Sequence, residues 1–281
     1  MANKTVPENC PETLEEKFDG KRTSINQLFD PNKEVIEYNG NTTIPLTNQD
    51  FPLIKNQLQS LKAVKVLSLC NNKLCGETIE DLSKSLLHIK TLKELDLSGN
   101  EMSLQDLFSL VNILRDASVE NLNISSNKNV VAKRKVEIPD KLVSYMFGSK
   151  SSFQVLNISH NKLGNYFWKT AFRELSFNEK LYKLVAVNCG VSDKAIAVLS
   201  SLLESGGKLQ EIDVRENTFS ADSQANLINS VQDNINITSL LCPVPSPKHK
   251  EILGNIINQN NLFHKVRILF YFHKTLNSQK K

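Results

Sequence analysis

The sequence predicts an α/β solenoid, a curved horseshoe with parallel strands on its concave face and helices on its convex face. Three observations predict it. A strand-like segment recurs six times in phase, first at residues 67–74 and next at 95–102. An Asn or Cys closes each copy, and these closing residues are separated by 28, 27, 34, 28 and 28 positions. The segments between copies have apolar residues at helical spacing.

Each copy has the form L-x-x-L-x-L-x-x-N/C-x-L. The L-x-L alternation directs both apolar side chains inward from a short strand. The chain then turns, and a buried Asn has the donors and the acceptor that the backbone of such a turn needs. A Cys can fill the same place as a small buried residue. We therefore assign a structural role to the closing residues, which are Asn72, Asn100, Asn127, Asn161, Cys189 and Asn217.

The other elements follow in chain order. A degenerate first copy at 36–41 precedes a helix over 49–61, and a last strand is expected at 237–242. Spacing of i, i+3, i+4 and i+7 predicts further helices over 80–89, 104–114 and 193–203. A helix around Phe167 places Trp168, Phe172 and Leu175 on one side, either in the core or as an exposed convex patch.

The chain is divided into three parts. Residues 1–30 form a polar N-terminal flank, residues 31–242 form a solenoid of about seven to eight repeats, and residues 243–281 form a C-terminal cap helix and tail. The cap helix is expected over about 248–258, after three prolines that interrupt the repeat. Terminal repeats are expected to be atypical because they close an open core.

Two segments allow two interpretations each. The third repeat is about six residues longer than the others, and its extra sequence within 128–152 includes Lys133, Arg134 and Lys135. This segment is either a solvated loop or a docking loop for an acidic partner. The apolar and basic run at 262–274 either completes the cap or forms a helix that binds a membrane surface or a partner.

The repeat resembles the leucine-rich repeat, and its 28-residue length is similar to the ribonuclease-inhibitor-like type of that repeat. The composition, rich in Asn, Lys and Ile, resembles that of proteins from AT-rich genomes. The resemblance extends to effectors of intracellular bacterial pathogens, which deliver such repeat proteins into host cells. It implies a protein-binding role and does not identify the partner.

Composition narrows the function further. The net charge of +4 is spread along the chain, without the basic and aromatic platform of a nucleic-acid-binding protein. No segment is apolar for long enough to be an integral membrane segment, and the N-terminus lacks a signal peptide. Five scattered cysteines favour a reducing, cytoplasmic location, in the effector case inside a host cell. We expect a monomer without cofactor or metal, because the cysteines and His lack metal-ligand spacing.

The strands' concave side is the candidate site. It is built mainly from small polar and acidic residues without aromatic anchors. We expect a non-catalytic protein-interaction scaffold, not an enzyme, since Asp96 and Asp213 each lie about 10 Å from Asn157. The alternative is a regulator of an enzyme, GTPase-activating or inhibitor-like, with Arg215 as the residue to test. The candidate protein-binding residues are Ser68, Glu94, Asp96, Asn123, Asn157, Lys183, Asp213 and Arg215.

Overall fold

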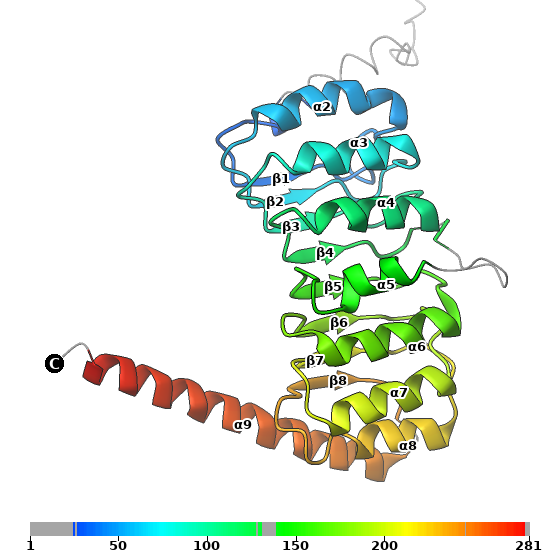
Figure 1. Ribbon diagram of the computed structural model, residues 1–281, viewed down its shortest axis with the longest axis vertical. Coiled ribbons are helices and arrows are strands. Elements are labelled where there is room, and N and C mark those ends of the chain that lie inside the picture. Colours follow the sequence, from blue (N-terminus) through cyan, green and yellow to red (C-terminus); the bar gives the residue numbers. More distant parts are fainter. Residues whose placement is uncertain (1–24, 26, 128, 131–138, 245, 279–281) are drawn as a thin grey trace, which may run out of the picture.

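A computed structural model describes residues 25, 27–127, 129–130, 139–244 and 246–278, with side chains as far as residue 265. In this part of the chain, eight parallel strands form one open sheet in chain order, and helices alternate with them. The strands stack along one side of the molecule and the helices along the other (Figure 1). The α/β solenoid predicted from the repeat is confirmed.

Every strand has three residues. The strands are β1 (Val35–Glu37), β2 (Val66–Ser68), β3 (Glu94–Asp96), β4 (Asn121–Asn123), β5 (Val155–Asn157), β6 (Lys183–Val185), β7 (Glu211–Asp213) and β8 (Ser239–Leu241). The helices are η1 (Asn48–Asp50), α2 (Phe51–Ser60), α3 (Glu77–Leu86), α4 (Leu104–Leu114), α5 (Asp140–Phe147), α6 (Gly164–Glu174), η2 (Leu175–Phe177), α7 (Asp193–Glu204), α8 (Ala221–Asn229) and α9 (Pro247–Ser278).

Strict register aligns equivalent residues of all repeats. Leu67 pairs with Leu95, Leu95 with Leu122, and Leu122 with Leu156, so the central residues of the strands form a continuous row. This row is buried between the sheet and the helices. Each repeat therefore buries its neighbour's apolar face, which gives a continuous one-dimensional core. Two residues of the flank, Ile25 and Phe29, are also buried in this core.

The closing Asn residues bind the backbone of their turns, as predicted, and they also connect neighbouring repeats. The Asn100 side-chain amide donates to the carbonyls of Leu69 and Leu97, both at 3.0 Å, and its oxygen accepts from the Leu74 N–H at 3.1 Å. Buried polar groups of the turn are thereby satisfied across the repeat boundary. The other members of this anchor row are Asn72, Asn127, Asn161, Cys189 and Asn217, and all are buried.

The residue before each anchor has a left-handed backbone, with φ between 54° and 67° at Asn71, Gly99, Ser126, His160, Asn188 and Glu216. Such a backbone disfavours most side chains, yet most of these positions are not glycine. Gly99 is the exception, and a Cβ atom there would come within 2.2 Å of the Asn71 side-chain oxygen. Close contact with the preceding repeat explains the glycine at this copy.

The helix predictions hold with some shifted ends. The helix predicted over 104–114 is α4, and that over 193–203 is α7 with one more residue. The helix predicted over 80–89 is instead α3 (Glu77–Leu86): it begins three residues earlier and includes the buried Ile79, and apolar Ile89 lies in the turn after it. The helix over 49–61 begins as the short η1, and the last strand is three residues of the predicted six.

The aromatic residues of α6 lie in the core, which settles the choice between core and convex patch. Trp168 and Phe172 are fully buried, and their ring centroids lie 5.5 Å apart. The Trp168 indole N–H donates to the Cys189 carbonyl at 3.1 Å, which joins the helix to the next repeat. Phe147 from α5 packs edge-on against Phe167 at 5.8 Å. These rings fill the middle of the solenoid.

The cap helix is much longer than the 248–258 expected. α9 has 32 residues, or about 48 Å of helix. No Pro or Gly follows Gly254 within it, so nothing in the sequence terminates it early. Leu253 and Ile256 pack against the last repeat as predicted, but beyond them the helix projects away from the stack of repeats (Figure 1). The run at 262–274 therefore does not complete the cap.

Candidate functional site

Two rows of side chains on the sheet contain most of the predicted site. Parallel pairing places equivalent residues of neighbouring strands about 4.8 Å apart. We call the first residues of the strands the leading row, which includes Val66, Glu94, Asn121, Val155, Lys183 and Glu211. We call the third residues the trailing row, which runs Ser68, Asp96, Asn123, Asn157, Val185, Asp213 and Leu241.

The structure brings one group of predicted residues together and separates another. Ser68, Asp96, Asn123 and Asn157 are consecutive in the trailing row, and the Asn123 amide donates to the Asp96 carboxylate at 3.1 Å. Val185 separates this group from Asp213. In the leading row, Glu94 is exposed, and Asn121 and Val155 lie between it and Lys183. The predicted site is therefore two clusters on one face. The first cluster is Ser68, Glu94, Asp96, Asn123 and Asn157, and the second cluster is Lys183, Asp213 and Arg215.

The Asx side chains of the trailing row also stabilise the turn that follows each strand. One oxygen of Asp96 accepts from the Ser98 N–H at 2.8 Å, and one oxygen of Asn157 accepts from the Ser159 N–H at 3.1 Å. Asn123 and Asp213 make the same contact two residues on. Sequence reasoning missed this role, although Asx residues in such turns are its usual signal.

Two ion pairs fix the charged side chains of the second cluster. The Arg215 guanidinium forms a fork with the Asp213 carboxylate, with Nη2–Oδ2 at 2.7 Å and Nε–Oδ1 at 3.0 Å. The hydrogen bond and charge of Asp213 raise the pKa of Arg215. Arg215 is 56% exposed but its partner only 10%, so the pair presents a positioned cation. Lys183 pairs with Glu211 at 2.7 Å in the leading row.

Apolar side chains surround this second cluster. Val155 and Val185 are half-buried, and Val187, in the turn that follows β6, is 9% exposed. Leu241, at the end of the trailing row, is 42% exposed. The sequence also places Val185 and Val187 on this face as an apolar spot, and the structure adds Leu241 on the far side of Asp213, which sequence reasoning missed. Leu241 lies 28 residues, or one repeat, after Asp213, and this spacing could have placed it in the trailing row.

Groups with catalytic chemistry have structural partners. The Ser159 hydroxyl accepts from the Val187 N–H at 3.1 Å, and His160 contacts the Asn188 amide at 3.3 Å. Burial raises the pKa of the Cys189 and Cys242 thiols to about 12, which keeps them protonated. Within the described ranges, no three His, Cys, Asp or Glu side chains gather as they would around a metal ion.

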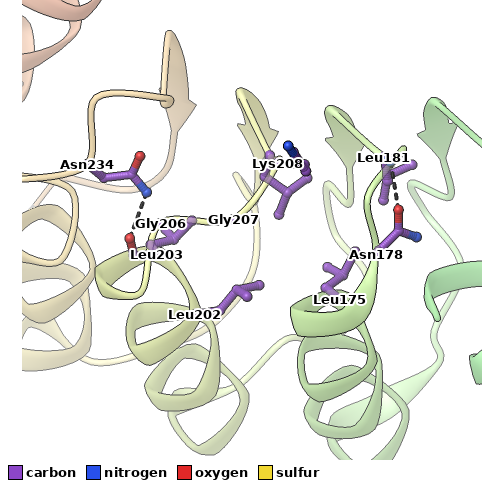
Figure 2. Close-up of a pocket in the computed structure, with 10 residues that line it drawn as sticks. Leu175, Asn178, Leu181, Leu202, Leu203, Gly206, Gly207, Lys208 and Asn234 are labelled. Carbon is purple, nitrogen blue, oxygen red and sulfur yellow. Dashed lines mark hydrogen bonds between the residues drawn. The ribbon is translucent and has the colours of Figure 1, made fainter. Parts of the chain in front are cut away.

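A small pocket lies between the C-terminal ends of neighbouring helices (Figure 2). Gly206 and Gly207 contribute no side chains to it, which leaves the space open. Its buried amides serve the backbone: Asn234 donates to the Leu203 carbonyl at 2.6 Å, and Asn178 accepts from the Leu181 N–H at 2.8 Å. The pocket is thus a packing gap at the helix ends, and none of the residues of the two rows lines it.

The Lys133–Lys135 part of the insertion lies outside the described residues, so the docking-loop interpretation stays a prediction. The described remainder of the long repeat forms α5. None of the helices in the portion described combines the length and hydropathy needed to span a bilayer.

The repeat, the single parallel sheet and the anchor row define an α/β leucine-rich repeat solenoid. Residues 88–111 match the family described as "Leucine Rich repeat". Among solved structures, leiomodin-1 actin-binding site 2 is similar over 82% of this chain and 99% of its own, with 10% identity and a TM-score of 0.36. A tropomodulin C-terminal domain from Caenorhabditis elegans is similar over 78% and 98%, with 12% identity and a TM-score of 0.33.

Proposed function

We propose that the chain is a non-catalytic protein-binding scaffold whose partner docks on the sheet between β5 and β8. The observation that carries this proposal is the exposed Leu241 in one row with Val185, beside the Arg215–Asp213 fork. Here the Arg215–Asp213 pair lies between two apolar side chains of the trailing row, Val185 on β6 and Leu241 on β8. Protein interfaces combine apolar area with oriented charged groups, and Arg is enriched in them. The partner surface should offer apolar side chains and a carboxylate for Arg215.

The first cluster supports a second, more polar contact on the same face. Glu94 is exposed, and Asp96 and Asn123 are half-buried with side chains already oriented by hydrogen bonds. Oriented polar groups lose little conformational entropy on binding. A partner that spans both clusters would meet acidic and amide groups at β3–β5 and apolar groups at β5–β8. An elongated protein surface fits this arrangement better than a small molecule.

A cytoplasmic location, and action as a secreted bacterial effector inside a host cell, form part of this proposal. The support for the location is the scattered cysteine pattern, and the four described cysteines are free thiols. The support for the effector role is the Asn- and Lys-rich composition together with the 28-residue repeat.

The enzyme-regulator alternative depends on Arg215. Its guanidinium is exposed but held by Asp213, so it would have to exchange this carboxylate for a developing charge on a bound enzyme. A GTPase turnover assay tests this function directly. Acceleration by the wild type that is lost in Arg215→Ala would establish it.

The scaffold proposal is tested by affinity capture with mass spectrometry on the full chain. Leu241→Lys places a charge in the apolar cluster, and Ile44→Lys is the matched control, since Ile44 is also 42% exposed but lies outside both rows. We expect a partner that wild type and Ile44→Lys recover and that Leu241→Lys loses at least ten-fold. Asp96→Lys tests the first cluster in the same way. Recovery of every partner by both face variants would refute the proposal.

A further inference from the structure

α9 consists of two parts in different surroundings. The proximal part, residues 247–261, packs on the last repeat: Leu253 and Ile256 are buried, and the Asn260 amide donates to the carbonyls of Asn234 at 2.8 Å and Ile237 at 2.7 Å. The distal part, residues 262–278, begins with Leu262 at 64% and Phe263 at 63% exposure. The helix continues where its contact with the solenoid has ended (Figure 1).

Apolar residues occupy one side of α9 in its proximal part and a different side in its distal part. Positions seven apart lie almost above one another in an α-helix. In the sequence, the buried Asn260 is followed at this spacing by Arg267 and Lys274, so basic residues occupy the positions that continue the packed row. The positions at i+4, i+7, i+11 and i+14 from the exposed Leu262 are Val266, Leu269, His273 and Leu276, so all of them except His273 are apolar. The distal part is therefore patterned for a different surface.

The charge of this segment has one sign. Glu251 is the last acidic residue of the chain, and no Asp or Glu occurs in residues 252–281. Aromatic residues are interleaved with the basic ones at Phe263, Phe270, Tyr271 and Phe272. The cations of residues 262–281 are Lys265, Arg267, Lys274, Lys280 and Lys281, with His264 and His273 in addition. Cationic and aromatic residues around an apolar stripe are typical of helices that lie in a lipid interface.

We propose that the distal part of α9 binds an anionic lipid membrane, with the helix lying in the headgroup region. Its apolar positions enter the acyl boundary, and its cations contact anionic headgroups. The helix joins the cap without an intervening turn, so membrane binding would hold the last repeats, including Leu241, near the lipid surface. This role is independent of the protein-binding face and adds a location to it.

A second copy of the chain is a poorer occupant of this stripe. The Leu262, Val266, Leu269 and Leu276 spacing covers about two heptads, whereas stable coiled coils need three to four. Pairing two distal parts would also bring together two wholly cationic segments without an acidic partner, because neither contains Asp or Glu. An anionic surface removes this repulsion.

Vesicle co-sedimentation of the full chain tests the proposal. Vesicles of phosphatidylcholine with about 30 mol% phosphatidylserine are compared with phosphatidylcholine alone. We expect wild type to prefer the anionic vesicles and Leu262→Asp/Phe263→Asp to bind at least ten-fold more weakly. Tyr166→Asp/Phe177→Asp is the matched control, because these two residues lie outside α9 and are 61% and 66% exposed. This variant should bind the vesicles like wild type. Circular dichroism and the thermal midpoint confirm that each variant folds.

The charge contribution has its own measurement. Arg267→Gln and Lys274→Gln should each weaken binding to anionic vesicles roughly five-fold, and added salt should weaken wild-type binding. The proposal is overturned if wild type does not prefer anionic vesicles, or if Leu262→Asp/Phe263→Asp binds them like wild type. It is equally overturned if the chain binds no vesicles and instead sediments as a dimer that the same double variant dissociates.

Discussion

The anchor row and the trailing row contain the same residue type at the same period but serve different purposes. Each trailing-row Asx precedes an anchor by four positions, as Asn157 precedes Asn161. Asn161 is 1% exposed and donates to the carbonyls of Ile124 at 2.8 Å and Ile158 at 2.9 Å. Asn157 is half-buried and makes one backbone contact to Ser159. Burial, not residue type, separates an architectural Asn from one available to a partner.

The largest expected effect is that of Asn161→Ala. It leaves two carbonyls and the Asn127 N–H without their buried partner, so unfolding free energy should fall by about 3 kcal/mol. Asn157→Ala is the matched control and should cost about 0.5–1 kcal/mol, because water reaches that site. Urea unfolding followed by circular dichroism measures both. Equal losses in the two variants would break the distinction between the rows.

Cys189 tests the anchor row with a weaker donor. Its sulfur lies 3.2 and 3.3 Å from the carbonyl oxygens of Ile158 and Val187, which share its single S–H, so Cys189→Ala should cost about 1–1.5 kcal/mol, less than Asn161→Ala. Burial raises the pKa of this thiol from 9.0 to about 12. The unfolded thiol ionises first, so this contribution to stability is present below pH 9 and is lost as pH rises toward 12.

Alkylation by iodoacetamide at pH 8 measures this protection. Cys189 should remain unmodified in the folded chain while the half-buried Cys70 and Cys75 react first, because the thiolate is the reactive form. Modification of Cys189 at the rate seen in denaturant would contradict its assignment to the anchor row.

The smallest expected effect belongs to the leading row. Lys183→Ala removes the ion pair between Lys183 and Glu211, and these two side chains are 40% and 39% exposed. Such pairs contribute little, so unfolding free energy should change by less than about 0.5 kcal/mol. If affinity for a partner changes while thermal stability does not, the leading row belongs to the binding face. A loss above about 1 kcal/mol would make this pair structural.

The sequence predicted the fold well where periodicity and burial agree. The ends of α4 match residue by residue because Ser103 caps the first turn and the apolar spacing continues to Leu114. α9 was predicted too short because periodicity reports only the residues that pack on a core. Beyond Asn261 the helix does not pack on the repeats, so its apolar residues have no core spacing to follow. Its length follows instead from the absence of a helix-breaking residue.

The candidate site was predicted less completely. Alternation along the strands correctly identified which residues share the sheet face, since register follows from the repeat. It did not predict that Asp96 and Asn157 bind the backbone of the next turn, or that Asp213 holds Arg215. Those contacts depend on side-chain rotamers and on local turn geometry, which a spacing pattern does not contain.

The unbroken register across the long third repeat has a consequence for how this protein can change. Asn121 pairs with Val155 in the same register as in every other repeat, although 34 residues separate the anchors on either side. Added length was absorbed without moving the sheet. Residues added between Asn127 and α5 should therefore leave the pairing of β4 with β5 unaltered, so this repeat can accept an inserted tag without moving the strand face.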